Sequence, residues 1–144
     1  MCQYSRAKID KVCKTLRMRK VYKVVEIAGG KVRSYYQYTD INLGGTVSKC
    51  TLTEFKKAIS KLSQVSHLND RIKTFVKEIK GEGIHAFPSL TEARKALKTD
   101  YTEPCPGYAS MILECEIPSG SGVIRGYGEN TIVTNRIKYV RLIR

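Results

Sequence analysis

The sequence lacks the features that mark membrane and secreted proteins. Its 144 residues contain no tryptophan, four prolines and no uninterrupted run of about 18 apolar residues, the length that a membrane-spanning helix needs. The basic N-terminal segment is followed by neither an apolar stretch nor a small-residue cleavage pattern, so no secretory signal is expected. We therefore expect a cytoplasmic protein without a transmembrane segment.

Potential metal ligands and disulfide partners are sparse and irregularly spaced. The cysteines and histidines are Cys2, Cys13, Cys50, Cys105, Cys115, His67 and His85. The cysteine number is odd and no C-x-x-C pair occurs, so neither a disulfide framework nor a zinc site is indicated. The two histidines have no ligand-type residues at suitable spacing around them. We expect no metal and no cofactor.

The sequence motifs of common catalytic sites are also missing. There is no G-x-x-x-x-G-K-[ST] phosphate loop, no G-x-G-x-x-G dinucleotide fingerprint and no G-x-S-x-G elbow. The pair Glu114-x-Glu116 resembles the E-x-E arrangement of some ADP-ribosyltransferases, but alternation with apolar residues is typical of the solvent side of an ordinary strand. His85 is a possible general base, although its apolar neighbours favour a structural role. The prediction is a protein without catalysis, and a transferase stays open as an alternative.

Positive charge is the strongest compositional signal. Lysine and arginine number 26 against 13 acidic residues, which gives a net charge of +13. The first twenty residues contain seven cations and one acid, and Ile9, Val12, Cys13 and Leu16 follow the spacing of one apolar helical face. We expect a short basic amphipathic helix over residues 1–20. It is either a solvated surface helix or a basic face for an anionic partner or a membrane. A body over 21–144 follows in the same single domain, 1–144.

Local signals predict an α+β fold. A β-hairpin is expected over 21–38, because Gly29-Gly30 suits a tight turn between two β-rich runs. Capping signals predict helices after Thr51, Asn69 and Ser89. A short strand at 84–87 and alternating residues from 111 to 143 complete a mostly antiparallel sheet with helices packed on one face.

Cations, tyrosines and amides coincide with glycine turns in two parts of the chain. Arginine pairs with phosphate, aromatic rings stack on bases, and asparagine can read a base edge. We expect Arg125 and Arg136 to meet at one end of the sheet as a phosphate clamp, with Tyr36 or Tyr38 as a stacking face. The predicted ligand-binding residues are Arg33, Tyr36, Tyr38, Arg125, Tyr127, Asn130, Asn135 and Arg136.

Two stretches also resemble a known group of proteins. The segments 21–34 and 83–93, which contain the Gly-Gly turn and Gly-Ile-His-Ala-Phe, resemble small phage and prophage proteins. The second segment and Ile117-Pro118 are similar to uncharacterised domains found beside pentapeptide repeats. Some small phage proteins of this type resemble Thoeris anti-defence sponges, which bind cyclic ADP-ribose-like signals without cleaving them. The resemblance implies a nucleotide-binding, anti-defence role in a host cytoplasm and assigns no binding residue by position.

Two classes of function follow besides the transferase. The first is a non-catalytic protein that sequesters a small anionic nucleotide, as a homo-oligomer, because a pocket between subunits encloses a ligand better than one flat sheet. The second is a nucleic-acid-binding module, for which the high positive charge is the natural cause. The missing RNA- and DNA-reading motifs favour the first by a narrow margin.

Overall fold

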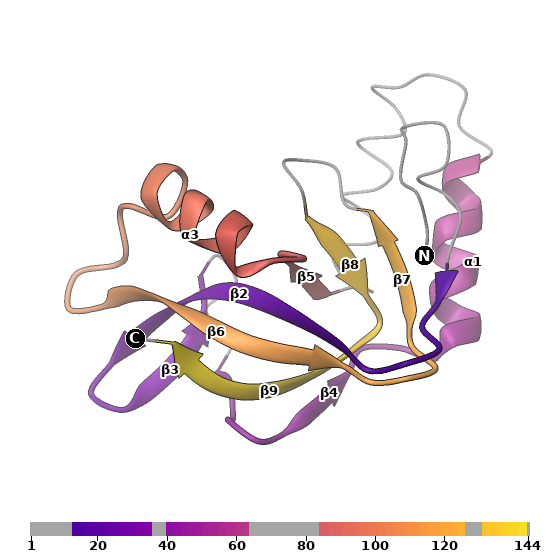
Figure 1. Ribbon diagram of the computed structural model, residues 1–144, viewed down its shortest axis with the longest axis horizontal. Coiled ribbons are helices and arrows are strands. Elements are labelled where there is room, and N and C mark those ends of the chain that lie inside the picture. Colours follow the sequence, from indigo (N-terminus) through magenta and orange to yellow (C-terminus); the bar gives the residue numbers. More distant parts are fainter. Residues whose placement is uncertain (1–12, 36–39, 64–83, 126–130, 144) are drawn as a thin grey trace.

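The computed structural model describes residues 13–35, 40–63, 84–125 and 131–143, and its elements are labelled in Figure 1. In chain order they are β1 (Cys13–Lys14), β2 (Arg19–Ala28), β3 (Lys31–Ser34), β4 (Thr46–Ser48), α1 (Leu52–Ser63), β5 (Ile84–Ala86), α3 (Leu90–Thr99), β6 (Ala109–Ile117), β7 (Gly122–Arg125), β8 (Ile132–Thr134) and β9 (Arg136–Ile143). The predicted helix after Asn69 lies outside the described residues.

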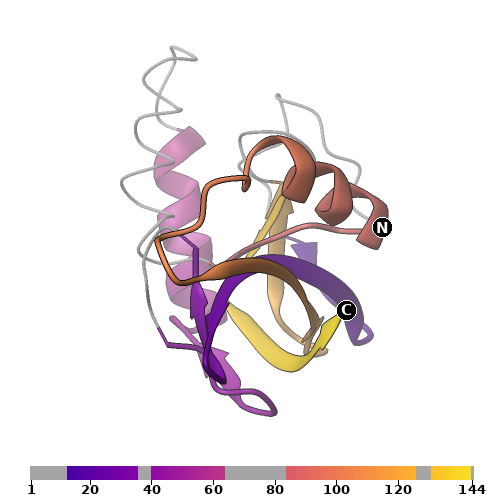
Figure 2. The same ribbon diagram turned by 90° about the vertical axis from the view of Figure 1, so that its left-hand side faces the viewer.

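The strands form a curled antiparallel sheet in two parts (Figures 1 and 2). One part has the order β3-β2-β6-β9-β4 and the other β1-β7-β8-β5. They are joined where β6 turns into β7, where β8 bends into β9, and at a bridge in which Tyr22 and Phe87 exchange backbone hydrogen bonds of 2.9 and 2.6 Å. The α+β class and the antiparallel sheet are confirmed, whereas the curling was not predicted.

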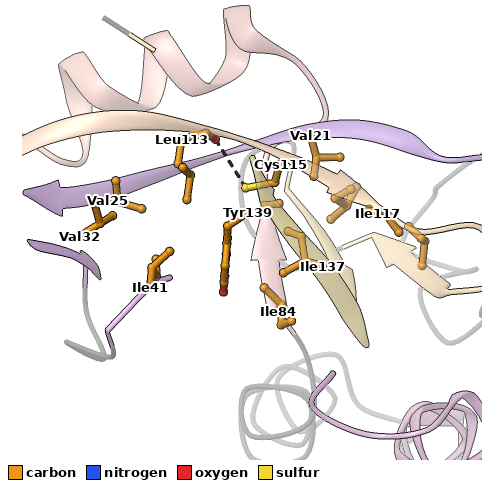
Figure 3. Packing of buried hydrophobic residues seen from close by; sticks show 13 residues of the cluster. Val21, Val25, Val32, Ile41, Ile84, Leu113, Cys115, Ile117, Ile137 and Tyr139 are labelled. Carbon is orange, nitrogen blue, oxygen red and sulfur yellow. Dashed lines mark hydrogen bonds between the residues drawn. The ribbon is translucent and has the colours of Figure 1, made fainter. Parts of the chain in front are cut away.

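The main hydrophobic core lies inside the curl (Figure 3). Because side chains alternate across a strand, one face of each long strand contributes to it: Val21 and Val25 from β2, Leu113 and Cys115 from β6, and Ile137 from β9. Ile84 and Ala86 of β5 and Val123 of β7 approach from the other part of the sheet. The curl thus encloses apolar side chains from both parts.

The two helices of the described part cover the outer side of the sheet. Phe55 and Ile59 of α1 pack with Ile124 and Val133 of β7 and β8. Ala93 and Ala96 of α3 pack with Val24 and Ile112 of β2 and β6 in a separate cluster. No helix within the described ranges is long and apolar enough to cross a membrane.

Both predicted helix caps within the described ranges form their expected hydrogen bonds. The Thr51 backbone N–H donates to Glu54 Oε1 and the Glu54 N–H donates to Thr51 Oγ1, each at 3.1 Å, which is a complete capping box for α1. Ser89 Oγ accepts from the Glu92 N–H at 3.2 Å and begins α3. The two helix starts were therefore predicted correctly from local chemistry.

The Gly29-Gly30 hairpin is confirmed as far as Ser34, and its predicted last residues, 36–38, lie outside the described residues. Its glycines have φ angles of 54° and 84°, which the mirror-image turns of tight hairpins require. Ala28 pairs with Lys31 directly across the turn. This fixes the register of every later pair in the hairpin.

The expected helix over residues 1–20 is wrong in its described part. Cys13–Lys14 form β1, which pairs with β7, and β2 begins at Arg19. Leu16, predicted to lie on the apolar face, is 87% exposed in the connection between these strands. The helical spacing was coincidental here, because backbone pairing with β7 decides the conformation. Residues 1–12 of the expected helix lie outside the described residues.

Candidate functional site

The structure describes the side chains of some predicted ligand-binding residues and not of others. Tyr36, Tyr38, Tyr127 and Asn130 lie outside the described residues, and Arg125 is described only by its backbone in β7. The side chains of Arg33, Asn135 and Arg136 are described, and each makes hydrogen bonds within the fold.

Arg33 is held by an internal ion pair. Its Nη2 lies 3.0 Å from Glu26 Oε2, and the Glu26 side chain is only 1% exposed. The guanidinium carbon also lies 3.6 Å from the centroid of the Tyr108 ring, a cation–π contact. Arg33 therefore neutralises a buried carboxylate.

The sequence contained a signal for this pair. A two-residue Gly29-Gly30 turn pairs residue 28 with residue 31, so Glu26 must lie opposite Arg33. Opposite charges facing each other across a hairpin attract directly. Applying the register of the predicted turn would have identified Arg33 as a partner of Glu26.

Asn135 lies at the bend between β8 and β9, and its side-chain amide connects separate parts of the fold. It is 3% exposed. Its Oδ1 accepts from the Gly122 N–H at 2.8 Å, and its Nδ2 donates to the Cys50 carbonyl at 3.1 Å. One amide thus ties β7, this bend and the segment before α1 together.

Arg136 braces the turn between β6 and β7. Its Nε donates to Ser121 Oγ at 3.2 Å and its Nη2 donates to the Ser119 carbonyl at 2.7 Å. The residue is partly exposed. Arg136 therefore combines a structural role with access to solvent.

The backbone register separates Arg125 from Arg136. Arg125 pairs with Ile132, whereas Val123 pairs with Thr134 and Arg136 lies two residues further on. At about 3.3 Å per residue, the partner of Arg125 lies roughly 7 Å along β8 from Thr134, and Arg136 follows beyond the bend at Asn135. Along the backbone, Arg125 adjoins the 126–130 connection and Arg136 lies beyond the opposite end of β8. Because the Arg125 side chain lies outside the described residues, the meeting of the two guanidinium groups stays a prediction without support from the register.

Glu114 differs from its expected place on the solvent side of a strand. It is 7% exposed and lies 3.2 Å from Arg141 Nε and 3.7 Å from Lys20 Nζ. The hydrogen bond from Arg141 holds the pKa of Glu114 below its ordinary value, against the opposing effect of burial. Glu116 is partly buried. Glu114 is consequently an ionised carboxylate held between two cations.

A group of polar side chains that was not predicted from the sequence lies on the inner side of the curl. Lys23 shares the inward face of β2 with Val21 and Val25, and its Nζ donates to the His85 carbonyl at 2.6 Å. Burial lowers the pKa of Lys23. Burial also raises the pKa of Cys115, whose thiol donates to the Leu113 carbonyl at 3.6 Å (Figure 3), and of Tyr139, each to about 12. Cys115 and Tyr139 therefore stay uncharged at neutral pH, and Lys23 is held by its hydrogen bond to the His85 carbonyl.

The outer surface carries most of the positive charge of the described residues. Exposed lysines and arginines lie on both helices, on the first three strands and the β1–β2 connection, before α1 and on β9: Lys14, Arg17, Lys20, Lys31, Lys49, Lys56, Lys57, Arg94, Lys95, Lys98, Lys138 and Arg141. The exposed carboxylates there are Asp40, Glu54, Asp100 and Glu103. In the part of the chain that the structure describes, no three His, Cys, Asp or Glu side chains gather as metal ligands would.

Comparison of the chain with models of known protein families, with curated proteins and with solved structures finds no match. The functional assignment therefore depends on the chemistry of the chain itself.

Proposed function

We propose that this protein binds nucleic acid through its exposed positive charge and catalyses no reaction. The carrying observation is where the charges lie. Cations extend over α1, α3, β9 and the β1–β2 connection, whereas the carboxylates of Glu26 and Glu114 are enclosed in ion pairs. A phosphate backbone is an extended polyanion, so it matches charge that extends over several elements.

The size of the charge excess supports the same proposal. A net charge of about 2 to 8 in magnitude keeps a small domain soluble, and this chain carries +13. Clustered like charges repel one another and destabilise the compact state. An anionic partner that neutralises them is the simplest reason for a protein of this size to carry so many.

Sequestration of a small nucleotide is less well supported. Arg33 and Asn135 are engaged inside the fold. Arg125 and Arg136 lie apart along the β7–β8 hairpin. The other predicted ligand residues, Tyr36, Tyr38, Tyr127 and Asn130, lie outside the described residues, so a sponge that acts as a homo-oligomer stays a prediction.

The material that co-purifies with the protein distinguishes these functions. We expect protein prepared at low salt to show excess absorbance at 260 nm, which nuclease or about 1 M salt removes, because screening weakens phosphate contacts. A mononucleotide or cyclic nucleotide that resists the salt wash and is released intact by heating would establish the sponge instead. A ligand recovered in chemically altered form would indicate an enzyme.

A further inference from the structure

The connection between β1 and β2 exposes apolar side chains among cations. Leu16 is 87% exposed and Met18 is 51% exposed. Lys14 and Arg17, which flank Leu16, are exposed as well. The connection thus presents large apolar groups to solvent in a strongly positive setting.

This connection is anchored at its base. The Thr15 N–H donates to the Ser121 carbonyl at 2.8 Å, and the Gly120 N–H donates to the Thr15 carbonyl at 2.7 Å. Thr15 Oγ1 lies 3.1 Å from the carbonyl oxygens of Pro118 and Ser121 and also accepts from the Ser121 N–H. Figure 1 shows the β1–β2 connection beside the turn that joins β6 to β7. The exposure of Leu16 is therefore set by a hydrogen-bonded framework.

A third cation, Arg136, reaches the same place from β9. Gly120 has a φ of +84°, and a Cβ built on it would lie 3.9 Å from Lys14 Cε and 4.0 Å from Arg136 Nη2. Two positively charged side chains from strands distant in sequence thus flank one glycine. We name Lys14, Leu16, Arg17, Met18 and Arg136 the basic corner.

We propose that the basic corner is the contact site for duplex nucleic acid, with Leu16 inserted as an apolar wedge between base pairs. The inference rests on the proposed function and names its site. Proteins that bend a duplex insert Leu, Ile, Met or Phe between base steps while cations hold the adjacent phosphates. The basic corner combines these two components on one anchored connection. Charge complementarity makes an anionic duplex the occupant, and the apolar side chains gain burial only when it binds.

The test measures binding and bending of a 24-base-pair DNA duplex labelled at its two ends. Leu16→Ser removes the apolar wedge and keeps every charge, and Leu43→Ser is the matched control because Leu43 is 48% exposed outside the basic corner. We expect Leu16→Ser to weaken binding about tenfold, the effect of losing much of one leucine's burial. It should also abolish the change in energy transfer between the labels, whereas Leu43→Ser changes neither.

Two double variants that each remove two cations test the role of charge at the basic corner. The double variant Lys14→Gln/Arg17→Gln should make the slope of log K against log salt shallower by about 1.8, because each phosphate that a cation neutralises contributes about 0.9 to the slope. The matched control Lys56→Gln/Lys57→Gln removes two exposed cations from α1. We expect it to change the slope by less than the corner variant.

The possible failures are distinguishable. If the unaltered protein binds no duplex, the proposed function fails and the inference with it. If it binds and both corner variants behave like their controls, only the basic corner is excluded. Binding to vesicles of phosphatidylcholine and phosphatidylglycerol that Leu16→Ser abolishes, without an effect on the duplex, would assign the corner to a lipid surface and overturn the proposal.

Discussion

The chain just before β2 and the hairpin at the C-terminal end of β2 use cationic side chains in opposite ways. Near the C-terminal end of β2, Arg33 lies against Glu26, whose side chain is 1% exposed, and over the Tyr108 ring. Before its N-terminal end, Lys14 and Arg17 are exposed, and no carboxylate of the described residues pairs with them. The first arrangement stabilises the fold and the second leaves charge available to a partner. The position of the nearest carboxylate, rather than the type of cation, separates these roles.

The largest effect should come from removing the buried carboxylate. We expect Glu26→Gln to lower the free energy of unfolding by about 3 kcal/mol, because it leaves Arg33 without its counter-charge in a partly buried place. Urea unfolding measures the change. Glu103→Gln, in an exposed loop, is the control and should cost less than about 0.5 kcal/mol. Equal stability of the two variants would mean that the Arg33–Glu26 pair does not stabilise the fold.

Burial of the Cys115 thiol should make the stability of the fold depend on pH in the alkaline range. The folded protein holds the Cys115 proton up to a pKa of about 12, whereas the unfolded chain releases it above its ordinary value of 9.0. The unfolded state therefore binds fewer protons in this window, and stability falls as pH rises. At pH 10.5 we expect Cys115 to account for a loss of about 2 kcal/mol relative to pH 8.

The variant Cys115→Ala isolates this contribution, since Tyr139 and Lys23 also titrate on unfolding and remain in both proteins. Urea unfolding of the two proteins at pH 8 and pH 10.5 gives the difference between their losses. An identical pH dependence would mean that water reaches the Cys115 thiol.

Replacing Arg136, whose side chain holds the turn between β6 and β7, should have an intermediate effect on the free energy of unfolding. Arg136→Gln removes the hydrogen bonds to Ser119 and Ser121, and we expect a loss of about 1 kcal/mol in stability. Lys138→Gln is the control because Lys138 is exposed on the same strand. A loss for Arg136→Gln no larger than for this control would show that the turn holds without the guanidinium.

The smallest effect on stability should come from replacing the exposed cations that precede β2. Lys14→Gln/Arg17→Gln should change the free energy of unfolding by less than about 0.5 kcal/mol, since exposed side chains away from core features contribute little. A loss of more than about 1 kcal/mol in urea would mean that these cations support the fold rather than a partner.

Signals confined to a few neighbouring residues predicted their elements correctly. The Gly29-Gly30 turn and the caps at Thr51 and Ser89 each act through a backbone geometry or a hydrogen bond within three residues. The helix expected over 1–20 failed in its described part because Cys13–Lys14 pair with β7, more than a hundred residues away. The curl likewise depends on distant pairing, such as the bridge between Tyr22 and Phe87.

The candidate site was less predictable than the fold. Arg33 and Asn135 carry the right chemistry for phosphate or bases, but their partners Glu26 and Cys50 become visible only through register and tertiary packing. The exposure of Leu16 and the approach of Lys14 to Arg136 near Gly120 arise from strands far apart in sequence. Residue type alone does not show which side chains remain available to a ligand, because that depends on the contacts each one makes in the folded chain.

The salt dependence of duplex binding tests the proposed function most directly. Fluorescence anisotropy of the labelled 24-base-pair duplex should show that log K of the unaltered protein falls linearly with log salt, with a slope of about −3 or steeper, because each neutralised phosphate contributes about −0.9. No complex at about 50 mM salt, or an affinity that does not change with salt, would contradict nucleic-acid binding through the charged surface.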